Sequence, residues 1–159
     1  MGQKASVEQI VRTRKNMDMT NAELDSVAEG WIRYQLAAEG SSVQAENWNF
    51  VSTAFEIRAG DPNLLWQLIL AIHSRNQSDA VRCVLSAGPL EDLLDGHGTA
   101  FIEVIEQQAN RDPGFGSLLG GVYRRSMSDD LWRRVTEIAT RSETSIENRR
   151  KGKGSGKQS

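Results

Sequence analysis

The sequence predicts an all-α protein, a compact bundle or a short HEAT-like stack of about six to seven helices, for three reasons. Apolar residues recur at intervals of three and four along most of the chain, which is the spacing of one face of an α-helix. Several of these segments begin with residues that cap helices and are followed by glycine or asparagine. The sequence lacks the sustained alternation of apolar and polar residues that is typical of β-hairpins.

The chain has 159 residues, which is enough for one domain with a hydrophobic core. We expect a flexible leader over residues 1–19, a helical domain over residues 20–141 and a disordered basic tail over residues 142–159. Glycine, serine and lysine dominate the end of this tail, and such a mixture buries too little apolar surface to offset the entropy of the chain.

The first helix of the domain is expected to begin at Thr20, because a hydroxyl followed three residues later by Glu23 forms the pattern of a capping box. A second helix, capped by Ser41 or Ser42, is expected to end at Gly60. Apolar positions in these and later helices include all four tryptophans, which we expect in the core: Trp31, Trp48, Trp66 and Trp132. The alternative is that one or two of them line a groove for a partner.

Two Asp-Pro pairs, residues 61–62 and 112–113, predict two further helix starts. Aspartate accepts backbone N–H bonds at the N-cap, and proline at the first helical position loses no donor that the helix would use. Residues 64–72 are apolar nearly all round, which is typical of a central helix. A shorter helix is expected over residues 79–87, with Cys83 as a small core residue.

The segment AGPLEDLLDGHG, residues 87–98, lies between two glycine-marked breaks. We expect Gly88 in the left-handed conformation at the end of one helix and Pro89 in the first turn of the next. Leucines at positions 90, 93 and 94 form an inward stripe, so the three carboxylates between them should face outward or flank its rim: Glu91, Asp92 and Asp95. Further helices are expected over residues 99–111 and from Ser128 onward.

Asp92, Asp95 and His97 are the candidate catalytic residues, because a histidine beside carboxylates can serve general acid–base catalysis or metal binding. Their spacing matches no known metal signature, and the second histidine, His73, lies on another helix. A single cysteine excludes a site with several thiolates. We therefore expect no cofactor and no metal, and we interpret His97 as a residue that caps helix ends.

The net charge of −2 hides an uneven distribution. Residues 20–140 hold nine basic and seventeen acidic side chains, whereas both ends of the chain are basic. An acidic body disfavours a nucleic-acid groove and favours a basic protein partner. Glu91 and Asp92 are the candidate partner contacts, while the tandem arginines at 124–125 and 133–134 are expected to pair locally with Asp129 and Asp130.

The chain shows no apolar run long enough to span a membrane and no secretory signal, which predicts a cytoplasmic protein. The first residues, MGQKAS, also fit the pattern for myristoylation at Gly2. Lysines of the tail can bind polyanions nonspecifically.

The run GPLEDLLxxHGxxFIxxIE over residues 88–106 is followed by AxxDPxF at 109–115 and by LGGVY at 119–123. With the Asp-Pro pair at 61–62 and the Asp-Asp-Leu-Trp stretch at 129–132, this pattern resembles a family of small, mostly bacterial proteins of unknown function. The resemblance covers roughly residues 60–135. It implies no known activity, so it assigns no catalytic residue.

The leading hypothesis is a non-enzymatic helical protein-interaction domain, regulatory or immunity-like, that binds a basic protein. The alternative is a hydrolase or metal-dependent enzyme centred on Asp92, Asp95 and His97. A third hypothesis is a tether that binds a membrane or a nucleic acid through the basic ends.

Overall fold

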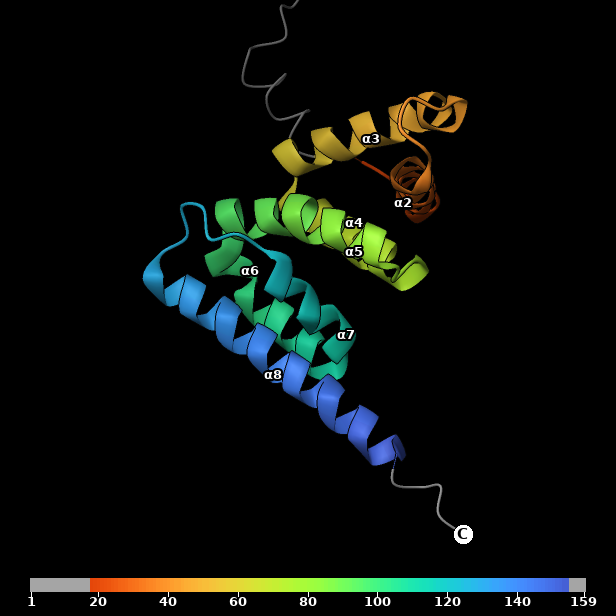
Figure 1. Ribbon diagram of the computed structural model, residues 1–159. Helices are drawn as coiled ribbons and strands as arrows, with labels where there is room; N and C mark the ends of the chain where they lie inside the picture. Colours follow the sequence, from red (N-terminus) through yellow and green to blue (C-terminus); the bar gives the residue numbers. More distant parts are fainter. Residues whose placement is uncertain (1–17, 155–159) are drawn as a thin grey trace, which may run out of the picture. The chain divides into compact units, whose positions relative to one another are not determined.

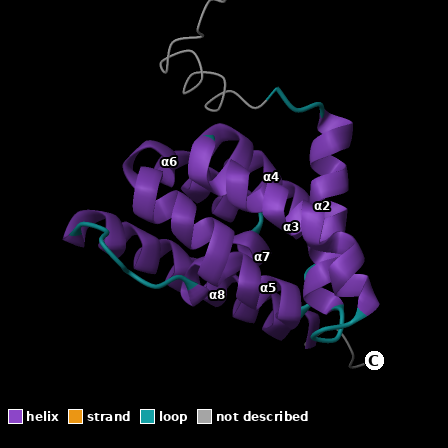
Figure 2. Cartoon of the chain, turned by 90° about the horizontal axis from the view of Figure 1, so that it is seen from above, coloured by secondary structure: helices purple, strands orange, loops and turns teal. Residues whose placement is uncertain are grey.

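The computed structural model describes residues 18–154, and every regular element within this range is a helix (Figure 2). The all-α prediction is confirmed, while the choice between a bundle and a HEAT-like stack stays a prediction. The expected disorder of residues 1–17 and 155–159 falls outside the described residues. No helix between residues 18 and 154 is both long enough and apolar enough to cross a membrane.

The described chain divides into two compact units, with the boundary between Val81 and Arg82. The first unit contains α2 (Asn21–Leu36), α3 (Ser42–Gly60) and α4 (Pro62–Arg75), and the boundary lies within α5 (Asp79–Leu85). The second unit contains the π-helix η1 (Ser86–Leu90), α6 (Glu91–Arg111), α7 (Pro113–Gly116), the 3-10 helix η2 (Ser117–Gly121) and α8 (Asp129–Gly154). A single domain over residues 20–141 stays a prediction.

The predicted helix starts of the first unit are confirmed. Thr20 and Glu23 form the capping box: the Thr20 amide donates to Glu23 Oε2 over 3.0 Å, and the Glu23 amide donates to Thr20 Oγ1 over 3.2 Å. Ser41 accepts from the amide of residue 44 and caps α3. Asp61 Oδ1 accepts from the amides of residues 63 and 64 and caps α4, with Pro62 in the first turn.

Helices α2, α3 and α4 pack against one another, and Trp31 of α2 is buried as expected. The core prediction is wrong for Trp48, which is 50% exposed on α3. The buried face of α3 is formed by Asn47, Val51, Ala54 and Ile57. Trp48 follows Asn47 directly, and adjacent residues are about 100° apart around a helix, so Trp48 lies beside this face. Trp66 and Trp132 are each partly buried.

In α5, Val81 and Leu85 are buried at a spacing of one turn, whereas Val84 is exposed. Cys83 is exposed, so its expected core position is wrong. The cysteine lies between the two buried residues, about half a turn from each, and therefore faces away from the side that they bury.

The break expected at Gly88 is also absent from the structure. Among the described residues, Gly40 is the glycine with a positive φ, so Gly88 is not left-handed. The chain instead passes from α5 through the π-helix η1, which contains Pro89, into α6. Proline has no N–H and crowds the carbonyl four residues before it, and a wider π turn accommodates it without ending the helical path.

In the second unit, α8 runs beside α6 and α7 (Figure 1). Its core includes the fully buried Phe115 of α7 and Val135 of α8. Small residues allow close contact between these elements, since a Cβ at Gly98 would overlap Leu131 and a Cβ at Gly116 would overlap Ser142.

Helix α8 continues to Gly154, whereas we expected the helical domain to end at residue 141. Ser142 is buried, and residues 145 and 146 are partly buried, so the packed stripe of the helix extends past the expected boundary. The expected disorder is therefore wrong for residues 142–154. The composition of residues 142–154 did not predict this helix, because arginine, lysine and glutamate occur in exposed tails and are also good helix formers.

Candidate functional site

The candidate acids of the sequence lie in the first turns of α6, opposite the loop that joins η2 to α8. Glu91 is buried, and its Oε2 accepts a hydrogen bond of 3.1 Å from the backbone amide of Tyr123. The expected outward position of Glu91 is therefore wrong, because the arriving loop covers the first turn of α6. This bond anchors the loop to the helix.

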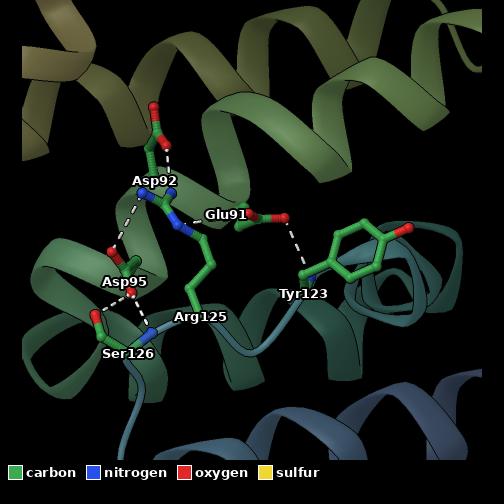
Figure 3. A network of polar contacts seen from close by, with 6 residues as sticks. All are labelled: Glu91, Asp92, Asp95, Tyr123, Arg125 and Ser126. Atoms are coloured by element: carbon green, nitrogen blue, oxygen red, sulfur yellow. Dashed lines mark hydrogen bonds and ion pairs between the residues drawn. The ribbon is translucent and has the colours of Figure 1, made fainter.

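Arg125 lies between three carboxylates of α6, as Figure 3 shows. Its Nη1 is 2.8 Å from Asp92 Oδ1, its Nη2 is 3.5 Å from Asp95 Oδ2, and its Nε is 3.7 Å from Glu91 Oε1. The hydrogen bond with Asp92, followed by the charge of Asp95, raises the pKa of the Arg125 guanidinium. We call Arg125 and these three carboxylates the Arg125 cluster.

The Arg125 backbone has φ of +48°, in the left-handed region. This region costs a non-glycine residue roughly 1–2 kcal/mol. The contacts of the guanidinium with α6 help to hold the residue in this conformation, as does the next residue of the loop, Ser126.

Ser126 binds Asp95 twice, through its amide over 3.0 Å and through its hydroxyl over 2.6 Å, both to Oδ1. The hydroxyl and then the amide of Ser126 lower the pKa of Asp95, and the charge of Arg125 adds to this effect. Asp95 is thereby held as a carboxylate. A carboxylate with a lowered pKa is a poor general acid near neutral pH.

His97 lies at a kink of α6, with φ of −139° and ψ of 17°, and its side chain is exposed. The break that we expected at residues 96–98 therefore exists as a bend within one helix. His97 lines an open surface pocket of about 370 Å³ together with Asp95, Ser126 and Ser128. Within residues 18–154 it makes no hydrogen bond or ion pair with a carboxylate.

The structure thus brings Asp92 and Asp95 to one cation and places His97 beside Asp95 in a shared pocket. The described residues contain no group of three or more His, Cys, Asp or Glu side chains that could hold a metal ion.

Sequence reasoning missed Arg125 and Ser126. Local pairing is confirmed for Arg124, which forms an ion pair with Asp129, and for Arg133 with Asp130 at 3.1 Å. Arg125 instead binds carboxylates thirty or more residues before it. The left-handed backbone conformation of Arg125, which directs its side chain, is a property of the loop, and no spacing rule connects this loop with α6.

A second set of polar contacts joins α6 and α8. The two carboxylate oxygens of Glu106 bind Arg134 over 2.8 Å and Arg141 over 2.6 Å. The hydrogen bonds from Arg141 and then Arg134 lower the pKa of Glu106. These ion pairs connect α6 with α8 and hold Glu106 as a carboxylate.

The first unit carries a different candidate surface. Trp48 and Phe55 of α3 are about half exposed, and the ring of Tyr34 on α2 lies 5.9 Å from that of Trp48 between centroids. Two large aliphatic side chains near the turn between α2 and α3 are also exposed: Leu36 and Val43. We call Tyr34, Trp48 and Phe55 the aromatic face.

The model of a family of unknown function, DUF6869, matches residues 36–143 of the chain. This range contains the Arg125 cluster and most of the aromatic face. No curated protein and no solved structure matches the chain.

Proposed function

This chain belongs to DUF6869, a family of unknown function, and we propose that it is a non-enzymatic interaction domain, regulatory or immunity-like, that binds a basic protein. The observation that carries the proposal is the charge of the first unit. Residues 18–81 contain nine acidic side chains and three arginines. Such an excess steers positively charged partners toward the surface and raises their association rate.

The arginines of the first unit already interact with neighbouring side chains. Arg75 Nη2 lies 2.9 Å from Asp25 Oδ1, and Arg75 Nε lies 3.7 Å from Glu29 Oε1. Arg33 donates to Asn47 and lies over the ring of Phe50. The acidic excess is therefore left for a partner to neutralise.

Three glutamates of this unit make no ion pair with any residue in the described range: Glu39, Glu46 and Glu56. All three are exposed. By contrast, Glu91 and Asp92, the contacts expected from the sequence, already bind Tyr123 and Arg125. We therefore propose that the first unit makes the main electrostatic contacts.

The experiment is affinity capture with the purified full chain in about 0.05 M and 0.5 M salt, where screening lengths differ severalfold. The control is the chain with Glu39→Gln, Glu46→Gln and Glu56→Gln. We expect a basic protein that is enriched on the wild-type chain, forms a defined complex once purified, and binds the control and high-salt samples at least tenfold more weakly. A chain that captures no specific protein, or one whose partner is insensitive to salt and to these substitutions, would contradict the proposal.

The enzyme alternative is favoured by one observation, the pocket that Asp95 and His97 share with two serine residues. Elemental analysis of the purified chain tests its metal-dependent form. One equivalent of bound metal that is lost in the variant Asp92→Asn or Asp95→Asn would support an enzyme. Loss of the metal in the control variant Glu143→Gln would indicate an unspecific effect.

A further inference from the structure

We propose that the aromatic face is the docking site for a basic amphipathic helix of the partner protein. This inference rests on the proposed function and names the surface and the recognition chemistry. Trp48 and Phe55 are seven residues apart on α3, which is close to two helical turns, so both point to the same side about 10 Å apart along the axis. Tyr34 extends this side onto α2.

The fold does not use these rings as its core. The packed face of α3 is formed by Asn47, Val51, Ala54 and Ile57, and the exposed fractions of Trp48 and Phe55 are 50% and 51%. Single exposed apolar residues are common on monomers, but large aromatic rings gathered on one side are typical of interaction surfaces. Tryptophan and tyrosine are also the residues that contribute most to binding energy at such surfaces.

Charge complementarity indicates that the partner segment is basic. Glu46 and Glu56 lie on the same helix as the rings, and Glu39 lies at the turn that leads into it. The ring of Phe55 already holds one cation, because the Arg58 guanidinium lies 4.8 Å from its centroid. A partner with lysine or arginine beside apolar side chains can make both ion pairs and cation–π contacts here.

The spacing of the rings indicates that the partner segment is a helix. Apolar anchors at positions i, i+3 or i+4, and i+7 of a helix repeat over the same two turns that separate Trp48 from Phe55. An amphipathic helix can therefore contact both rings with one stripe and the glutamates with its flanking cations.

The test uses the full chain and a labelled peptide of lysine and leucine, about 18 residues long, with leucine at helical spacing. A scrambled peptide of the same composition is the first control. Fluorescence anisotropy measures both affinities. We expect the amphipathic peptide to bind at least tenfold more tightly than the scrambled one, with a Kd that rises with salt.

Variants then locate the site. Trp48→Ala with Phe55→Ala should weaken peptide binding at least tenfold, and Glu46→Gln with Glu56→Gln should weaken it severalfold. Tyr123→Ala and Glu143→Gln, which alter exposed residues of the second unit, should leave it unchanged. Circular dichroism checks that each variant keeps its helical content.

Several outcomes would overturn the proposal: no binding, equal binding of the scrambled peptide, or binding unaffected by the paired aromatic substitution. Dimerisation of the chain alone that the same substitution abolishes would assign the face to a second copy, and would also overturn it. A captured natural partner that still binds the aromatic variant would leave the proposed function standing and refute this surface alone.

Discussion

At the scale of single residues, the contacts of Asp95 show how the loop before α8 holds a candidate catalytic carboxylate. Its Oδ1 accepts two hydrogen bonds from Ser126, and Oδ2 faces Arg125 at 3.5 Å. A general acid must carry a proton that it can donate, whereas these donors stabilise the charged form. This arrangement holds the loop before α8 against α6.

This interpretation predicts an order of effects on the pKa of Asp95. Ser126→Ala should raise this pKa more than Arg125→Gln, because the Ser126 hydroxyl is the larger cause of its lowering. Arg124→Gln should leave it unchanged, since Arg124 pairs with Asp129. Carboxyl carbon shifts followed by NMR during an acid titration measure the three values. A larger effect of Arg125→Gln would show that charge, and not hydrogen bonding, holds the carboxylate.

The lowered pKa values of Asp95 and Glu106 also predict a dependence of stability on pH. In the unfolded chain these groups bind protons near their ordinary values of 3.8 and 4.5, and in the folded chain they do so only at lower pH. The unfolded state therefore binds more protons in this window, so the stabilisation is complete above it and is lost as pH falls through the folded pKa values.

Urea unfolding at a series of pH values measures this loss, which should begin as the pH drops below about 4.5. Glu106→Gln should be less stable than the wild type at pH 7 and should show a shallower loss in acid. Glu143→Gln, on the exposed side of α8, serves as the control. An acid profile of Glu106→Gln as steep as that of the wild type would contradict this prediction.

At the scale of elements, the helix starts follow from local sequence, and Asp61 is a clear case. This residue ends α3, since its amide donates to Ile57 over 3.1 Å, and its side chain caps α4. Both functions involve residues at most four positions away. The sequence was therefore sufficient to predict them, as it was for Thr20, Ser41 and Asp112.

Asp61→Ala should destabilise the chain by about 1 kcal/mol, because two amides in the first turn of α4 lose their acceptor. Asp61→Asn should be close to the wild type, since asparagine is an equally good N-cap residue. Thermal or urea unfolding compares the three chains. Equal losses in both variants would mean that the charge of Asp61, and not its capping bonds, supports this junction.

Other features of the elements could not be predicted from local pattern. The π-helix η1 keeps Pro89 within a continuous helical path, although proline after glycine is an ordinary signal for a new helix start. Ser142 of α8 is buried against α7, where a Cβ on Gly116 would overlap it, so α8 packs past the expected end of the domain. These outcomes depend on which neighbours the helices meet.

At the scale of the whole molecule, charge is distributed differently over the two units. The first unit holds the acidic excess and the aromatic face, whereas residues 82–154 contain eleven acidic and eleven basic side chains. The second unit holds the Arg125 cluster and the contacts of Glu106 with two arginines. This difference supports a binding function for the first unit.

The core of the second unit gives a prediction of large effect. Phe115 is fully buried, so Phe115→Ala should cost about 3–5 kcal/mol, a large part of the roughly 5–15 kcal/mol that stabilises a typical domain. Tyr123→Ala, which changes a side chain that is 72% exposed, should stay within about 0.5 kcal/mol of the wild type. Chemical unfolding followed by circular dichroism measures both. A loss below about 1 kcal/mol for Phe115→Ala would mean that this core is loosely packed.

The sequence by itself determined the helical class, the capped starts of the helices and an irregularity near His97, because each depends on residues within about one turn of one another. Tertiary structure alone decided that Arg125 would reach α6, that Glu91 would be covered and that Trp48 would be left in solvent. Periodicity places a side chain on one side of a helix. Which sides become buried, and which distant charges meet, depends on how the helices pack.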